Sequence, residues 1–243
     1  MQNVKISLII PAFNEEAIIR KTIETVLSYL ELNFSEYELV IADDGSTDDT
    51  KSIAESTGNP HLVCVSHTPN KGKGCAVREG IMAADGDVLI YTDADLAYGI
   101  DAVGELVQKI ESDGTDLAIG SRKLHPQGYR DYPPIRLIAS RLFSFLTGYL
   151  AGFNYDTQCG LKAFSSKAAK DIFSRCETDG FAFDFEVMMY AMGLSYTVAQ
   201  IPVMVKNHRE SKVRVFHDSI IMFWDIVSIR KTVRKRIKGE KLL

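Results

Sequence analysis

The first hundred residues repeat one pattern, in which a short apolar run ends in acidic or glycine-rich residues and a helical segment follows. Apolar runs of strand length alternate with segments whose apolar residues recur at helical spacing. This alternation predicts βαβ units, and therefore a Rossmann-like, mainly parallel sheet flanked by helices. The runs are KISLIIPAF, YELVIADDGS, HLVCVSH and DVLIYTDAD, and the clearest helical segment is residues 15–31.

The second half of the chain is less regular. We expect a strand ending at Arg122, a turn-rich loop over 125–134, an apolar helix over 135–153, a helix over 181–193 and a C-terminal amphipathic helix from about residue 215. The predicted division is one α/β domain over 1–214 and an amphipathic helix with a basic tail over 215–243. Within that domain, we distinguish the regular half 1–100 from the less regular half 101–214.

Composition is that of an ordinary globular protein, with 46% hydrophobic and 25% charged residues. The four cysteines form no CxxC pair, so their spacing predicts neither a zinc site nor a disulfide framework. We expect free thiols in a reducing compartment. The apolar start meets Pro11 too soon for a signal peptide, and no apolar run reaches the roughly 20 residues that cross a bilayer.

Charge is unevenly distributed along the chain. Residues 230–243 hold seven Lys or Arg and one Glu, a net of +6, so the remaining residues carry 21 minus 31, or −10. A basic tail is either a solvated helix end or a contact for an anionic membrane surface or nucleic acid. We expect no nucleic-acid partner, because no binding motif is present and the acidic body would repel phosphate.

Two carboxylates, Asp93 and Asp95, follow the fourth predicted strand. Ligands of parallel α/β sheets sit beyond the carboxyl ends of the strands, so these side chains should face a ligand. Strand alternation would place both carboxylates on one side and Ala94 opposite. Carboxylate oxygens suit Mg²⁺ or Mn²⁺, and such an ion would bridge a diphosphate. The alternative is an ordinary polar turn.

Three further features stand at the same predicted edge. Asp43 and Asp44 end the second strand, Glu15 follows the first, and Lys73 lies in the glycine-rich turn 70–74. Each has a simpler explanation, respectively a turn, a helix cap and a helix start. Together they favour a site for a nucleotide diphosphate, although the turn lacks P-loop spacing.

Eight motifs resemble a known family. SLIIPAFNEE, VIADDGSTDDT, NKGKGCAVREG and YTDADL are similar to family-2 glycosyltransferases of the GT-A fold. GSR, DTQCGLKAF, FAFDFE and ESKVRVFHDS resemble the polyprenyl-phosphate hexose synthases, and most closely the dolichyl-phosphate glucosyltransferase branch. Ala97 stands where the mannosyl branch usually has a glutamine that ligates metal, which argues against a mannosyl assignment.

The resemblance implies roles for individual residues. The nucleoside would be held by Pro11, Phe13, Glu15, Ile41 and Asp43. Ribose, diphosphate and metal would be met by Asp93, Ala94 and Asp95, with Asp95 the main metal ligand. Sugar hydroxyls or the acceptor site would be served by Asp156, Gln158 and Asp184. Arg209 and Lys212 would close over the donor phosphates.

The acceptor phosphate would need cations. Arg122, Arg130, Arg136 and Arg141 cluster in sequence around the apolar helix 135–153, and arginine forks readily onto phosphate oxygens. We expect Arg122, Arg136, Arg141 and Gln158 to hold it. The apolar face of that helix is either plain core or lies in a membrane interface beside the lipid chain.

The expected reaction is inverting, metal-dependent transfer of a hexose from UDP-glucose, or next GDP-mannose, to a polyprenyl phosphate. A phosphate with a second pKa near 6 needs no strong base, and Asp184 is the one candidate base. The protein would sit peripherally on the cytoplasmic face of a membrane, with a membrane-protein partner as an option. The alternatives are transfer to a polysaccharide or other hydroxyl acceptor, and a non-enzymatic nucleotide-sugar binder.

Overall fold

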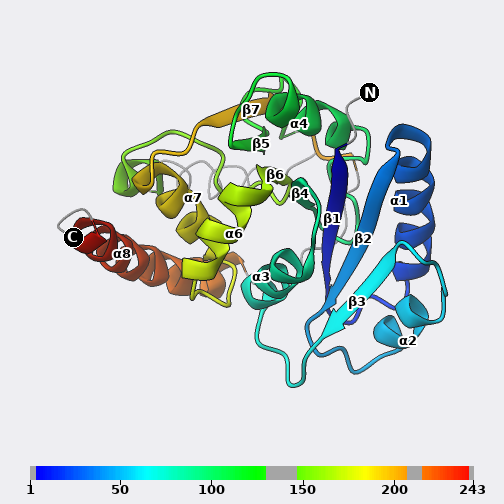
Figure 1. Cartoon of the computed structure of the whole chain (residues 1–243). Helices are drawn as coiled ribbons and strands as arrows, with labels where there is room; N and C mark the ends of the chain where they lie inside the picture. Colours follow the sequence, from blue (N-terminus) through cyan, green and yellow to red (C-terminus); the bar gives the residue numbers. More distant parts are fainter. Residues whose placement is uncertain (1–3, 130–146, 207–214, 241–243) are drawn as a thin grey trace.

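A computed structural model describes residues 4–129, 147–206 and 215–240, with no account of side chains over 215–223 (Figure 1). The described strands are β1 (Lys5–Ala12), β2 (Glu36–Asp43), β3 (Leu62–Ser66), β4 (Val88–Tyr91), β5 (Leu117–Ser121), β6 (Lys162–Ser165) and β7 (Val198–Pro202). The described helices are α1 (Ile19–Asn33), α2 (Thr50–Glu55), α3 (Lys73–Ala83), α4 (Ala102–Glu111), α6 (Ser166–Arg175), α7 (Phe183–Gly193) and α8 (Val215–Glu240).

The described strands form one seven-stranded sheet in the order β3-β2-β1-β4-β6-β5-β7. β6 pairs antiparallel with both neighbours, β4 and β5, and every other pairing is parallel. The mainly parallel α/β fold predicted from the sequence is therefore confirmed. In the described part of 195–206, the chain forms the strand β7.

Helices cover both faces of the sheet, because neighbouring strand residues point to opposite sides. On β1, Ile6, Leu8 and Ile10 pack with α1 and α4, whereas Ile9 packs with α3 on the other face. Helices α6 and α7 complete that second face, and α8 packs against α7 (Figure 1). A parallel sheet buried on both faces explains the nearly continuous apolar strands of the sequence.

The carboxyl ends of the parallel strands lie at one edge. The Asp44 N–H donates to the Ala12 carbonyl at 2.8 Å and the Thr92 N–H to the Ile9 carbonyl at 3.1 Å, so the segments after β1, β2 and β4 run side by side. Since β6 is antiparallel, its beginning at Lys162 meets the same edge. Residues from both halves of the chain are thus brought together there.

The C-terminal helix α8 lies beside α6 and α7 at the periphery (Figure 1). Its buried stripe is Ile226, Ile229 and Val233, which pack in the same core as α7. Trp224 and Val227 lie outside this stripe and are 67% and 37% exposed.

None of the helices in the described ranges combines the length and apolar character that crossing a membrane requires.

Candidate active site

The acidic pair Asp93 and Asp95 lies in a turn after β4 and outside the strand. β4 ends at Tyr91, and the Leu96 N–H donates to the Asp93 carbonyl at 2.9 Å, which closes a four-residue turn. The expectation that strand alternation sets the two side chains was therefore wrong. The two carboxylates still lie close to each other. As a consequence, the charge of Asp93 adds to the effect of burial in raising the pKa of Asp95.

Two contacts fix the shape of this acidic turn. The Thr22 hydroxyl of α1 donates to the Ala94 carbonyl at 2.7 Å, and the Ala97 N–H donates to Asp95 Oδ1 at 3.0 Å. Leu96 adopts a left-handed φ of 48°. Sequence analysis missed Thr22, and the available signal was a threonine among the apolar positions of a helix that faces the core.

A lysine lies between the acidic turn and the second half of the chain. Lys73 begins α3, and its Nζ donates to Asp93 Oδ1 at 2.5 Å. Burial alone would lower the pKa of Lys73, but the charges of Asp93 and Asp184 raise it. On the opposite side of Asp93, any side chain at Gly160 would collide with the carboxylate. The position of Asp93 therefore requires glycine at 160.

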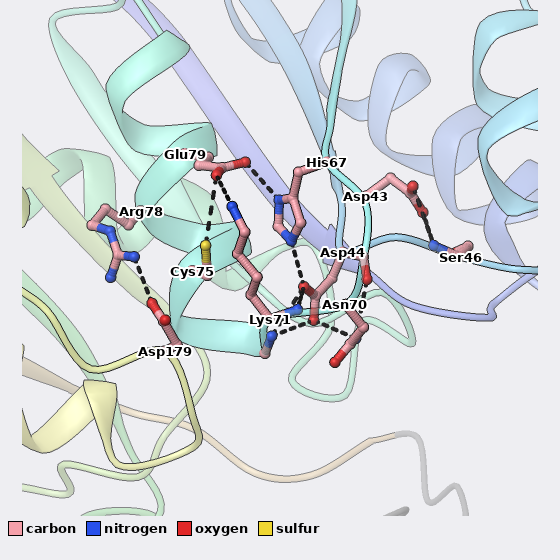
Figure 2. A network of polar contacts seen from close by, with 11 residues as sticks. Asp43, Asp44, Ser46, His67, Asn70, Lys71, Cys75, Arg78, Glu79 and Asp179 are labelled. Atoms are coloured by element: carbon pink, nitrogen blue, oxygen red, sulfur yellow. Dashed lines mark hydrogen bonds and ion pairs between the residues drawn. The ribbon is translucent and has the colours of Figure 1, made fainter.

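Asp43 and Asp44, at the end of β2, make different contacts. Asp43 is buried and accepts from the Ser46 N–H at 3.3 Å. Asp44 accepts from the Lys71 N–H at 2.9 Å, the Gly72 N–H at 2.9 Å and the Asn70 amide at 2.7 Å (Figure 2). Asp44 thereby shapes the turn that leads into Lys73. Its assignment to nucleotide-sugar binding stays a prediction.

The backbone conformation and the surroundings of Gly45 explain why the DDG motif has a glycine at this position. Its φ is 73°, a left-handed conformation that favours glycine, and a Cβ there would lie 2.8 Å from the Asn70 nitrogen. The loops after β2 and β3 can therefore cross only with glycine at this position.

The residues predicted to hold the nucleoside lie on β1 and β2 and just beyond β1. Phe13 is 37% exposed at the rim. The charge of Glu15 contributes to raising the pKa of Asp95, after burial and Asp93, so Glu15 approaches the acidic turn. Pro11 is partly buried, whereas Ile41 is fully buried in the sheet core. Their contact with a nucleoside stays a prediction.

Asp184 lies in a buried polar cluster beneath this edge. Asp184 Oδ1 accepts from the Tyr91 hydroxyl at 2.6 Å and pairs with the Lys162 ammonium. Lys162 is completely buried and also donates to the Thr157 carbonyl at 3.1 Å and the Cys159 carbonyl at 2.6 Å. The pair therefore holds the loop before β6. Sequence analysis identified Asp184 but assigned no role to Tyr91 and Lys162, although both lie inside the quoted motifs YTDADL and DTQCGLKAF.

Arg122 forms a forked pair with Asp156. Nε donates to Asp156 Oδ2 at 2.9 Å and Nη2 to Oδ1 at 2.7 Å, and the Arg122 N–H also donates to Oδ2 at 3.0 Å. Burial alone would raise the pKa of Asp156, but the hydrogen bonds from Arg122 lower it. These contacts join the end of β5 to the loop before β6.

Within the described part of the chain, two buried polar atoms near this pair have no hydrogen-bond partner. They are Ser121 Oγ and Gln158 Nε2. A buried polar group without a partner is costly, and one of the ways it is satisfied is by a ligand or an ordered water. Gln158 thus fits a ligand-facing role better than its sequence neighbours do.

Four predicted site residues lie outside the part of the chain that the structure describes. They are Arg136, Arg141, Arg209 and Lys212. Most of the predicted apolar helix over 135–153 is outside it as well, as is Arg130.

The mainly parallel sheet and its acidic turn define a GT-A glycosyltransferase. The family model "Glycosyl transferase family 2" matches residues 7–173. The chain therefore belongs to glycosyltransferase family 2 and is a glycosyltransferase.

Named relatives align over nearly the whole chain. Glycosyltransferase AglD of Haloferax volcanii is 31% identical and aligns with 96% of this chain, which spans only 39% of AglD. The dolichyl-phosphate beta-glucosyltransferase of Dictyostelium discoideum is 31% identical, over 95% of this chain and 75% of that protein. The human enzyme of the same name is 30% identical, over 93% and 75%.

Solved structures share the fold. Mycobacterium tuberculosis glucosyl-3-phosphoglycerate synthase, in complex with Mn²⁺, UDP and phosphoglyceric acid, superposes with a TM-score of 0.67 at 24% identity. The match covers 95% of this chain and 78% of that one.

Proposed function

We propose that this protein transfers a hexose from a nucleotide sugar to a polyprenyl monophosphate, with inversion at the sugar. UDP-glucose is the favoured donor and GDP-mannose the next. One observation carries the donor half of the proposal: two adjacent carboxylates and a lysine meet in a turn at the carboxyl edge of the sheet.

The acidic turn fits a hard divalent cation. Carboxylate oxygens from Asp93 and Asp95 are the ligands that Mg²⁺ and Mn²⁺ prefer, and a structural neighbour is titled as a complex with Mn²⁺ and UDP. When bound, the ion would stabilise negative charge on the departing diphosphate. In the described residues the shell holds these two carboxylates, so water and diphosphate oxygens would complete it.

Lys73 would share that task. Its ammonium neutralises Asp93 in the structure, and its flexible stem lets it turn toward a phosphate once the metal occupies the carboxylates. Asp43 and Glu15 would meet the nucleoside, beside Pro11, Phe13 and Ile41.

Two observations support a polyprenyl monophosphate as the acceptor: the names of the relatives, and the fact that a monophosphate needs no general base to react. Several relatives are named dolichyl-phosphate beta-glucosyltransferases. A monophosphate is already largely ionised near neutrality, and Asp184 is engaged with Lys162 and Tyr91. We therefore assign Asp184 a positioning role. Arg122 likewise orients the loop that carries Gln158.

We also propose the two-part organisation and a membrane-surface location. Residues 1–214 form the catalytic domain, and 215–243 form a helix whose basic tail contacts anionic lipid. Each basic residue near such a surface contributes about 1 kcal/mol. The exposed Trp224 and Val227 would enter the interface beside it. The cytoplasmic face, and a membrane-protein partner, belong to the same proposal.

Transfer assays test the function. Purified protein is incubated with Mn²⁺ or Mg²⁺ and radiolabelled UDP-glucose or GDP-mannose, with and without a short polyprenyl phosphate. We expect label to enter the organic phase only when metal and lipid are both present and the enzyme retains Asp95. The matched control is Asp113→Asn, which changes an exposed aspartate paired with Lys109. Transfer to a sugar hydroxyl without lipid would replace this proposal with the polysaccharide alternative.

A further inference from the structure

A second group of metal-ligating side chains lies away from the acidic turn. His67, Cys75 and Glu79 each offer one ligand atom, and these atoms all lie within 4.8 Å of one another. His67 follows β3, whereas Cys75 and Glu79 are one helical turn apart on α3 (Figure 2). Cys75 is buried, and the Glu79 side chain is 38% exposed. The group therefore has a closed side and an open side.

The histidine is oriented as a metal ligand would be. His67 Nε2 lies 2.8 Å from Asp44 Oδ1, and Asp44 is fixed in turn by the backbone of the 70–72 turn. A ligating histidine usually donates its second N–H to a carboxylate in this way. With Nε2–H donating to Asp44, the Nδ1 lone pair faces Glu79 Oε2 at 2.7 Å. Two lone pairs at that distance call for a proton or a cation between them.

The ligand separations suit a tetrahedral ion. Ordinary zinc–ligand bond lengths place sulfur and oxygen about 3.6 Å apart and nitrogen and oxygen about 3.4 Å apart. Cys75 Sγ lies 3.6 Å from Glu79 Oε1. His67 Nδ1 lies 2.7 Å from the other carboxylate oxygen, Glu79 Oε2. For one oxygen to serve as the ligand, the carboxylate would rotate and the imidazole would withdraw by about 0.7 Å from Oε2, which is a side-chain adjustment. Lys71 Nζ, 3.7 Å from Glu79 Oε1 and 46% exposed, is free to turn into solvent.

We propose that His67 Nδ1, Cys75 Sγ and the Glu79 carboxylate bind a zinc-type cation, while the Asp44 carboxylate accepts from His67 Nε2–H and holds the ring in place. The mixed N, S and O ligands favour Zn²⁺ over the Mg²⁺ or Mn²⁺ suited to the all-oxygen pair Asp93 and Asp95. A water on the open side takes the fourth position. Burial raises the pKa of the Cys75 thiol, and the ion would displace that proton on binding. The ion would tie β3, α3 and the turn before Lys73 together.

Co²⁺ is the spectroscopic probe, because its bond to a thiolate gives a charge-transfer band in the near ultraviolet. We expect metal-free full-length protein to bind one equivalent of Co²⁺ with this band, and excess Zn²⁺ to abolish it. Cys75→Ala should remove the band. Cys64→Ala, a partly buried cysteine of β3 outside the group, should retain it. Asp95→Asn should retain it too, because the acidic turn offers no sulfur.

Glu79→Gln is the second variant. Because the Glu79 side chain is partly exposed, we expect this variant to fold as the wild type does. It should weaken Co²⁺ binding at least tenfold while circular dichroism stays unchanged, and Zn²⁺ should raise the melting temperature of the wild type only. The proposal is overturned if the wild type gives no thiolate band, or if the band survives Cys75→Ala. A wild type that binds no metal near neutrality would show that a proton bridges His67 and Glu79.

Discussion

The two halves of the candidate site use charge differently. In the donor half, the Lys73–Asp93 pair remains 21% and 31% exposed at its side chains, and Asp95 lies beside it. In the acceptor half, Lys162–Asp184 is 0% and 6% exposed and Arg122–Asp156 is 11% and 3% exposed. The first set can exchange its partners for a ligand. The second is closed and holds the backbone, so we expect substitutions in the two halves to fail for different reasons.

The largest effect should follow from Asp95→Asn. Loss of one carboxylate from the metal shell removes stabilisation of the departing diphosphate, so we expect turnover to fall by about 10²–10³-fold. Folding should be unaffected or slightly improved, because burial already disfavours the charged carboxylate. Steady-state kinetics measures the loss of turnover, and a urea titration measures the stability of the variant. An unfolded variant would contradict the contrast between the donor half and the acceptor half of the site.

Lys162→Met should produce the opposite pattern. It leaves Asp184 buried with only the Tyr91 hydroxyl, and breaking a buried ion pair costs about 3–5 kcal/mol. Chemical denaturation should show this loss in the free energy of unfolding. Lys167→Met, an exposed lysine on α6, is the matched control and should change stability by no more than about 0.5 kcal/mol. Equal stability of the two variants would contradict the structural role of the pair.

Thr22→Val sharpens the comparison with a smaller effect. The change keeps the side-chain shape but removes the hydroxyl that donates to the Ala94 carbonyl. Losing this bond costs about 1 kcal/mol, so Mn²⁺ affinity should weaken roughly fivefold while the nucleotide pocket stays intact. Calorimetric titration with Mn²⁺ measures it. Thr22→Ser restores a hydroxyl and should recover the wild-type affinity; no difference between the two variants would exclude Thr22 as the support of the turn.

The smallest effects should appear in pH dependence. Burial and Asp93 raise the pKa of Asp95, so on acidification Mn²⁺ affinity should begin to fall at a higher pH than for an ordinary aspartate. The sign for folding is opposite: metal-free protein loses stability as pH rises through the range in which Asp95 ionises, and Asp95→Asn lacks this loss. Titrations monitored by manganese electron paramagnetic resonance test the first statement.

Lys73 refines this pH prediction. Its charge lowers the pKa of Asp95, although less than burial and Asp93 raise it. Lys73→Met should therefore move the onset of metal loss to a still higher pH. An onset that moved to lower pH would mean that Lys73 competes with the metal more strongly than it stabilises the ionised carboxylate.

The donor half was predictable because its signals are local. Asp43 ends the apolar strand β2, Asp44 follows it, and Asp93 comes two residues after β4, and parallel strands bring their carboxyl ends to one edge. What failed was finer: the four-residue strand β4 ends before Asp93, so a turn sets the two carboxylates and strand alternation does not. Thr22, 72 residues from Ala94, has no local signal for its contact.

The acceptor half resisted prediction because its contacts are long-range. Arg122 and Asp156 are 34 residues apart, and Lys162 and Asp184 are 22 apart. They meet because β6 lies antiparallel between β4 and β5. The spacing of apolar residues in the sequence does not predict this position or direction of β6. The group of His67, Cys75 and Glu79 was also not predicted from the sequence. It contains a single cysteine, so a search for regularly spaced cysteines cannot find it.

Calorimetric binding of UDP-glucose to wild type and Asp95→Asn, with and without Mn²⁺, tests the central claim most directly. The account predicts metal-dependent binding to the wild type and its loss in Asp95→Asn, with Asp113→Asn behaving as wild type. Equal binding of the nucleotide sugar with and without metal, or undiminished metal-dependent binding to Asp95→Asn, would contradict the assignment of the acidic turn as the donor metal site.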